Sequence, residues 1–248
     1  MDLTLLWIIG AGLAGGALSV LLAATAAYSV LSGWVPRMVS YSAGVLLGVA
    51  FLGLLPEAFE KSTDAHSLFG IVLAGILAFF LLEKAALWRH SHEHDDRGTR
   101  EPSGILILVG DAFHNFVDGV LIAAAFLTDL RLGVTTTLAV MAHEIPQEVG
   151  DFMVLLKAGY GRGRALLLNL AVSLTSVAGG IVGYFTLEGA QGLVQYALLV
   201  AASCFVYIAV ADLIPDMHRQ NSAGEIGWQL GLMTVGIATI WAVEALLH

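Results

Sequence analysis

Two apolar stretches of this chain carry clusters of side chains that can bind a metal ion. The first, GDAFHNFVDG, holds His114 and Asp118 four residues apart, and the second, HEIPQEVGD, holds His143 and Gln147 at the same spacing. Residues four apart lie on one face of a helix. Two helices can therefore direct imidazole, carboxylate and amide groups at one shared point. We expect a divalent metal ion at that point.

The rest of the chain is too apolar for a soluble domain. Of the 248 residues, 58% are hydrophobic and 12% are charged, and the mean hydropathy is +0.83. Soluble domains have about 45–50% apolar and about 25% charged residues. The composition therefore predicts an all-α polytopic membrane protein, with residues 1–248 forming a single transmembrane domain.

Charge and cysteine content exclude other classes. The net charge is −9, and no basic stripe indicates nucleic-acid binding. A single cysteine, Cys204, leaves no intrachain disulfide and no cysteine-based zinc site. No Lys or Arg precedes the first apolar run, so we expect no cleavable signal peptide.

Eight apolar runs approach or exceed the roughly 20 residues that a membrane-spanning helix needs. They cover 3–31, 35–59, 66–88, 104–126, 132–158, 165–185, 192–214 and 226–247. The polar stretch 89–103 between the third and fourth runs is predicted to be a loop. Its His90, His92 and His94 either bind metal weakly or are simply solvated.

The basic residues predict how the chain is oriented, because cytoplasmic loops are enriched in Lys and Arg. With the amino terminus outside, only Lys61 and Arg131 of the 11 basic residues lie on the outer side. Both termini are therefore predicted to be extracytoplasmic, with the 89–103 loop in the cytoplasm. We expect a multi-pass protein of the cell (inner) membrane.

A short internal similarity links the second and seventh runs. One ends Leu-Leu-Pro-Glu at 54–57, and the other ends Leu-Ile-Pro-Asp at 213–216. In the predicted orientation the two lie near opposite faces of the membrane, as an inverted repeat would place them. Chance similarity in an apolar chain is the alternative.

Ionisable groups inside a membrane are costly, at about 2.5–3.5 kcal/mol each at its centre. Their concentration in two runs therefore points to an ion or to a water-filled path. Imidazole, carboxylate and amide oxygen together suit Zn²⁺, and also Fe²⁺, Mn²⁺, Co²⁺ or Cd²⁺, whereas Cu⁺ prefers sulfur ligands. Asn115 and Glu144 are expected to line a neighbouring second site that Asp118 bridges.

Pro146 is expected to open the fifth run beside His143. It lacks an N–H group, so the carbonyl of Ala142 loses its helical donor. A freed carbonyl is tolerated at membrane depth where it lines a cavity.

Further polar residues have two readings each. Asp111, placed near the outer end, is an entrance group or an ordinary interfacial charge, and Glu148 and Asp151 are exit groups or solvated ones. Asn115 binds metal or joins helices by hydrogen bonding. The remaining candidates for the path or a second site, each with packing or interfacial charge as the alternative, are Asn169, Ser173 and Glu57.

HNFVDG at 114–119 and HEIPQEVGD at 143–151 resemble the signature sequences of the ZIP (Zrt/Irt-like protein) family of divalent-metal transporters, closest to its LIV-1 type and short prokaryotic relatives. LLPEAFE, FLLEKAALWRH and YIAVADLIPDM extend the resemblance over nearly the whole chain. It implies eight helices in a 3+2+3 arrangement, uptake into the cytoplasm by alternating access, and frequent dimers. It also implies a metal site at His114, Asp118, His143 and Gln147, with a neighbouring site at Asn115, Asp118 and Glu144.

The chain departs from the family pattern in three places. Gln147 stands where many LIV-1-type members have His, and Gly53 where many relatives have His. The sixth run offers only Asn169 and Ser173 where some members have Glu. These differences leave the cargo and the occupancy of the second site open.

Two other functions are compatible with the same residues. His143-Glu144-x-x-Gln147 resembles the HExxH zinc motif of metalloproteases, but its second His is missing and Pro146 interrupts the helix. A metal sensor without transport is the other alternative.

Overall fold

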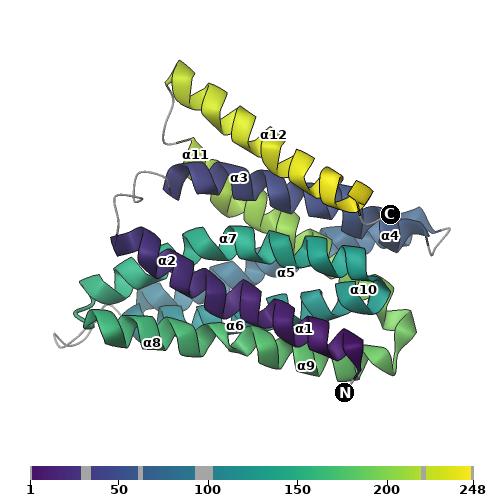
Figure 1. Cartoon of the computed structure of the whole chain (residues 1–248), viewed down its shortest axis with the longest axis horizontal. Coiled ribbons are helices and arrows are strands. Elements are labelled where there is room, and N and C mark those ends of the chain that lie inside the picture. The colour runs from purple at the N-terminus through teal and green to yellow at the C-terminus, as the bar shows by residue number, and fades with distance from the viewer. Residues whose placement is uncertain (1, 29–34, 61–63, 93–102, 219–221, 247–248) are drawn as a thin grey trace.

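The computed structural model describes the chain except for residues 1, 29–34, 61–63, 93–102, 219–221 and 247–248. The described residues form long helical segments packed side by side, without strands among them (Figure 1). In chain order the segments are α1 (Leu3–Leu13), η1 (Ala14–Leu18) and α2 (Ser19–Tyr28); α3 (Val35–Gly48), η3 (Val49–Leu54) and α4 (Leu55–Glu60); α5 (Ala65–His92); α6 (Ser103–Thr128); α7 (Leu130–Lys157); α8 (Arg162–Ser173) and α9 (Thr175–Glu188); α10 (Gln191–Tyr207), η5 (Ile208–Leu213) and α11 (Ile214–Met217); and α12 (Ala223–Leu246).

Within the described ranges, seven helical stretches are long and apolar enough to cross a membrane. They are Leu3–Thr25, Arg37–Glu60, Ala65–Leu82, Leu108–Thr128, Arg162–Glu188, Gly192–Met217 and Gly224–Leu246. This confirms the prediction of an all-α polytopic membrane protein.

The eighth predicted run, 132–158, corresponds to α7. Its 28 residues would extend about 42 Å at 1.5 Å per residue, enough to cross a bilayer. α7 is not among the seven apolar stretches because it contains polar residues, including those from His143 to Asp151. The count of eight crossings and the 3+2+3 arrangement therefore remain predictions.

The predicted loop at 89–103 begins later than expected, because α5 continues to His92. No Gly or Pro interrupts the sequence there, so nothing local ends the helix. The structure describes the backbone of His90 and His92 but not their side chains, and His94 lies outside the described residues.

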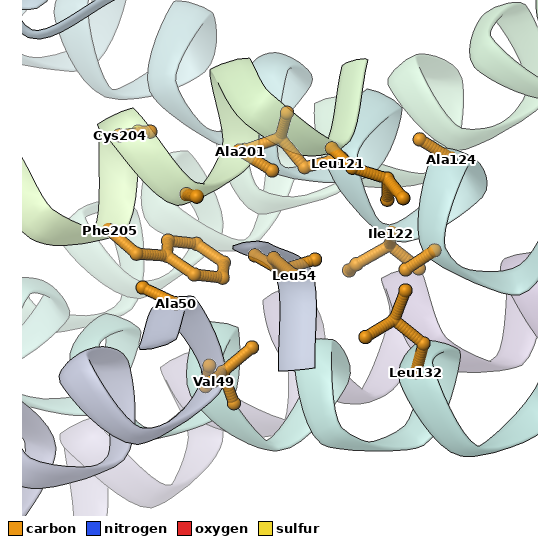
Figure 2. Close-up of a cluster of buried hydrophobic side chains, with 14 of the residues drawn as sticks. Val49, Ala50, Leu54, Leu121, Ile122, Ala124, Leu132, Ala201, Cys204 and Phe205 are labelled. Carbon is orange, nitrogen blue, oxygen red and sulfur yellow. The ribbon is translucent and has the colours of Figure 1, made fainter. Parts of the chain in front are cut away.

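α7 lies among its neighbours, in contact with α2, α3, α6, α8 and α12 (Figure 1). On one side of the molecule α6 packs along α9, and on another α3 packs along α12. The main core joins η3, α6, α7 and α10, and Figure 2 shows Leu54, Ile122, Leu132 and Phe205 pointing toward one another there.

Each of the two similar Pro-containing sequences follows a wide helical turn. The π-helix η3 has six residues and ends just before Leu55-Pro56-Glu57. The π-helix η5 also has six residues and ends just before Ile214-Pro215-Asp216. The two similar sequences thus share a π-helical turn before the proline, and the inverted repeat remains a prediction.

The contact between α6 and α9 depends on glycine. A Cβ atom on Gly179 would lie 1.9 Å from the carbonyl oxygen of Phe116, and one on Gly119 would lie 1.9 Å from the carbonyl oxygen of Ser176. Real Cβ atoms do not approach backbone so closely. The two helices therefore pack at a separation that only glycine permits at these positions.

We expect Gly179→Ala to destabilise the protein by about 1–3 kcal/mol, because the new methyl group forces α6 and α9 apart. Thermal unfolding of the purified protein in detergent would show a midpoint lower by several degrees. Gly231→Ala is the matched control, since a Cβ atom there has no neighbour within 4 Å. Equal midpoints for the two variants would contradict the close contact.

Candidate metal centre

α6 and α7 form an antiparallel pair joined at Asp129. The Asp129 carboxylate accepts a hydrogen bond from the backbone N–H of Leu132 at 2.6 Å and so caps the start of α7. In such a pair, residues early in α6 lie beside residues late in α7. This register brings the two sequence clusters together.

Four predicted ligand residues converge between these helices. His143 Nε2 lies 3.1 Å from Asp118 Oδ2 and 3.2 Å from His114 Nε2. His114 Nε2 lies 3.4 Å from Glu144 Oε1 and 3.8 Å from Asp118 Oδ2. Ligands about 2.0–2.2 Å from a tetrahedral Zn²⁺ lie about 3.3–3.6 Å from one another. The four measured distances lie on both sides of this range, so shifts of a few tenths of an ångström would let all four groups contact a single ion.

The atoms that meet at this centre are mostly acceptors. His143 Nδ1 lies 2.9 Å from the carbonyl oxygen of Ala139, and a carbonyl only accepts, so Nδ1 carries the proton. In the neutral ring Nε2 is then unprotonated and free to bind metal. Both oxygens of Asp118 and of Glu144 are buried without a hydrogen-bond donor in the described structure. Buried acceptors that face one another need a shared cation.

The centre is enclosed by protein. Asp118, His143 and Glu144 are at most 1% exposed, whereas the side chain of His114 is 22% exposed. The His143 ring also lies 6.1 Å from the ring of Phe205 in α10. His114 is therefore the ligand with the most access from outside the centre.

Asn115 and Gln147 point their amide nitrogens elsewhere. Asn115 Nδ2 lies 3.0 Å from Asp111 Oδ1, and Gln147 Nε2 lies 3.2 Å from the same oxygen. The structure places Glu144 beside His114, Asp118 and His143, whereas Gln147 directs its amide nitrogen at Asp111. Glu144 was predicted for the neighbouring site, and it belongs to both groups of potential ligands.

Asp111 was predicted near the outer end, opposite the exit groups, but the structure places it beside Glu148. Asp111, Glu144 and Glu148 offer oxygen atoms that all lie within 4.8 Å of one another. The antiparallel pair explains this, because Asp111 is early in α6 and Glu148 is late in α7. An entrance at Asp111 and an exit at Glu148 therefore cannot lie at opposite ends of a path.

The other predicted path residues lie outside these two groups of ligands. Asp151 is half-buried, three residues after Glu148 in α7, and Glu57 lies in α4. In α8, Asn169 and Ser173 are buried. The Ser173 hydroxyl donates to the carbonyl of Leu170 at 3.0 Å, whereas Asn169 Oδ1 is buried without a partner in the described structure.

Ser42 in α3 is a contributor that the sequence did not reveal. Its hydroxyl reaches the carbonyl oxygen of Ala142, the group that Pro146 deprives of a helical donor. The same hydroxyl lies 2.8 Å from the carbonyl of Met38, so its proton serves one of the two. Ser42 and Ala142 are 100 positions apart in the sequence, and no local pattern could have linked them.

Comparison with known proteins gives consistent matches. A profile of the ZIP zinc transporter family matches residues 88–244. The chain is 34% identical over 218 residues to zinc transporter ZIP13 of Pongo abelii, covering 82% of this chain and 65% of that protein. It is 44% identical over 143 residues to zinc transporter ZIP4 of Mus musculus, covering 57% of this chain and 21% of that protein. The chain thus spans less than two thirds of the length of either relative.

The contact between Ser42 and Ala142 leads to a double-mutant prediction. Ser42→Ala leaves the Ala142 carbonyl without its donor and should cost about 1–3 kcal/mol. In a Pro146→Ala background the new backbone N–H can bind that carbonyl, so the same change should cost much less. Thermal unfolding of the four proteins in detergent measures the difference. An equal loss in both backgrounds would show that the hydroxyl does not serve this carbonyl.

Proposed function

Since the chain belongs to the ZIP zinc transporter family, we propose that it carries divalent transition-metal ions across a membrane into the cytoplasm. Zn²⁺ is the first choice of cargo, with Fe²⁺, Mn²⁺, Co²⁺ and Cd²⁺ as competitors. The observation that carries the proposal is the convergence of His114, Asp118, His143 and Glu144 between two helices of a membrane protein. Mixed imidazole and carboxylate ligands suit this class of ion.

In this proposal the ion exchanges its water for the imidazoles of His114 and His143 and the carboxylates of Asp118 and Glu144. The partial exposure of His114 makes it the first ligand that an arriving ion meets. Asn115 and Gln147 act indirectly, since their amide nitrogens hold Asp111 one turn away. α7 serves as the eighth membrane crossing.

Release follows from the direction of the helices. The predicted orientation places the start of α6 and the end of α7 on the cytoplasmic side. Asp111, Glu148 and Asp151 then lie between the His centre and the cytoplasm, and they conduct the ion from the His centre into the cytoplasm. Alternating access would open the centre to one side at a time, with both termini extracytoplasmic in the cell membrane and the protein forming homodimers.

The protease alternative is not favoured by membership in a transporter family. A catalytic zinc site usually has three protein ligands and an open position for water. Gln147, which stands at the second His of the HExxH motif, directs its nitrogen at Asp111 rather than at the His centre. A non-transporting sensor would use the same ligands, so only measured flux separates it from a carrier.

We expect saturable Zn²⁺ flux into proteoliposomes that contain a metal-sensitive dye. His143→Asn should reduce it at least about tenfold, because the ion loses a buried ligand. His66→Ala, which changes an exposed histidine at the start of α5, is the matched control and should transport normally. Competition by Cd²⁺, Mn²⁺, Fe²⁺ and Co²⁺ identifies the preferred cargo. Unchanged flux in the His143 variant would remove this centre from the transport path.

Uptake should also fall on acidification. Histidine binds metal only when neutral, and its ordinary pKa is about 6.5. Lowering the pH from about 7.5 to about 5.5 adds a proton that competes with the metal, so loading weakens as pH falls. Initial rates at equal pH on both sides of the liposome membrane measure this effect. A flat rate over that range would count against histidine coordination.

A further inference from the structure

Ser42 is the point at which a helix without metal ligands reaches the backbone of the His centre. The ligands of that centre, all in α6 and α7, are His114, Asp118, His143 and Glu144. Ser42 is 1% exposed, and its hydroxyl contacts the carbonyl oxygen of Ala142 in α7. α3, which carries Ser42, also packs along α12 and against η3 and η5. A contact from this separate group of helices therefore ends one residue before a metal ligand.

The proton of the Ser42 hydroxyl has two acceptors within reach, and the carbonyl of Ala142 has the greater need of it. The other acceptor is the carbonyl of Met38, 2.8 Å away in the same helix. In an α-helix that carbonyl already accepts the backbone N–H of the residue four positions later. The carbonyl of Ala142 lacks this donor because Pro146 has no N–H, and a carbonyl left unpaired inside a protein is costly. The hydroxyl therefore donates to Ala142.

The Ala142 carbonyl is directly connected to His143. The carbonyl group and the backbone nitrogen of His143 belong to one planar peptide unit, so a hydrogen bond to the oxygen restrains the rotation of the whole unit. The ring of His143 is restrained separately, since Nδ1 lies 2.9 Å from the carbonyl oxygen of Ala139. One restraint on His143 thus comes from α7 itself, and the other comes from α3.

We propose that Ser42 is a positioning residue for metal binding. Its hydroxyl holds the turn of α7 that Pro146 opens, and thereby aims His143 and Glu144 at the ion. Ser42 acts through the Ala142 carbonyl and is not itself a ligand. The inference deepens the proposed function and rests on it for one point, the divalent ion bound at the His centre.

The contact also links metal binding to the packing of α3. A coupling between two sites acts equally in both directions. Since the Ser42 contact favours the metal-binding geometry of α7, a bound ion favours the contact between α3 and α7 by the same factor. α3 in turn packs along α12. Helices that hold no ligand therefore respond to the loading of the centre.

Zn²⁺ binding to the full chain in detergent, measured by competition with a chelating dye, tests the role of the hydroxyl. Ser42→Ala should weaken binding about 10–100-fold, the usual effect of removing a group that orients a ligand. In a Pro146→Ala background the carbonyl of Ala142 regains a backbone donor, so the same change should weaken binding less than about threefold. An equal loss of affinity in both backgrounds would show that Ser42 acts through packing, and would overturn the inference.

A second pair of variants isolates the hydroxyl without a change of shape. Ser42→Thr and Ser42→Val add the same branched side chain and differ only in a hydroxyl group against a methyl group. The Thr variant should bind Zn²⁺ about tenfold more tightly than the Val variant, because only the first can donate to Ala142. Any shift of α3 caused by the added branch is common to both. Equal affinities would contradict the positioning role.

Ser203→Ala is the matched control for a loss of stability. The Ser203 hydroxyl is also buried, and it also crosses to another helix, lying 3.1 Å from the carbonyl oxygen of Val72 in α5. The variant should bind Zn²⁺ as the wild type does when both are measured below their unfolding midpoints. A loss of affinity as large as that of Ser42→Ala would show that binding follows general stability, against the proposal.

Flux measurements separate this inference from the proposed function. In proteoliposomes Ser42→Ala should raise the KM for Zn²⁺ and change the maximal rate less than about twofold, because binding rather than the later steps is weakened. Wild-type flux with equal Zn²⁺ affinity in the Ser42→Ala protein would keep the carrier and remove the positioning role. The expected affinity pattern without wild-type flux would keep the positioning role and remove the carrier. A wild type that binds no Zn²⁺ would remove both.

Discussion

Buried hydrogen-bond acceptors from α6 and α7 face one another, and this is the constraint on which the rest of the structure depends. Unprotonated His143 Nε2 lies 3.1 Å from an Asp118 oxygen, and Asp118 and Glu144 have no donor in the described structure. In a low-dielectric interior these groups destabilise the protein unless a cation joins them. The same instability makes the centre a place where a metal ion gains binding energy.

The surrounding helices hold this unfavourable arrangement in place. α6 is packed against α9 at a distance that Gly119 and Gly179 permit, and α7 is in contact with helices on several sides. Pro146 removes the helical hydrogen bond to the carbonyl of Ala142, next to His143, and the Ser42 hydroxyl of α3 reaches that carbonyl. The local break is therefore tied to a helix outside the α6–α7 pair. Movement of α3 relative to α7 would alter the backbone next to a metal ligand.

Much of the fold and of the candidate site could be predicted from local patterns. Apolar runs indicate helices in a membrane, and the four-residue spacing of His114 and Asp118 puts both on one face. The signature sequences indicated the ZIP family, which the profile match over 88–244 confirms. The prediction that Asp111 lies opposite Glu148 was wrong, although the order of the helices along the chain implies that the two residues lie at the same level. Followed through the turn at Asp129, the chain returns Glu148 to the level of Asp111.

The sequence by itself determined the membrane class, the helical faces and the set of residues that can bind metal. These features depend on composition and on spacing within one helix, which is local geometry. Only the tertiary structure decided that Glu144 meets His114, that Asn115 and Gln147 direct nitrogen at Asp111, and that Ser42 reaches Ala142. Each of these contacts depends on the register and rotation of one helix against another. Packing of the whole chain sets that register, and no short stretch of sequence encodes it.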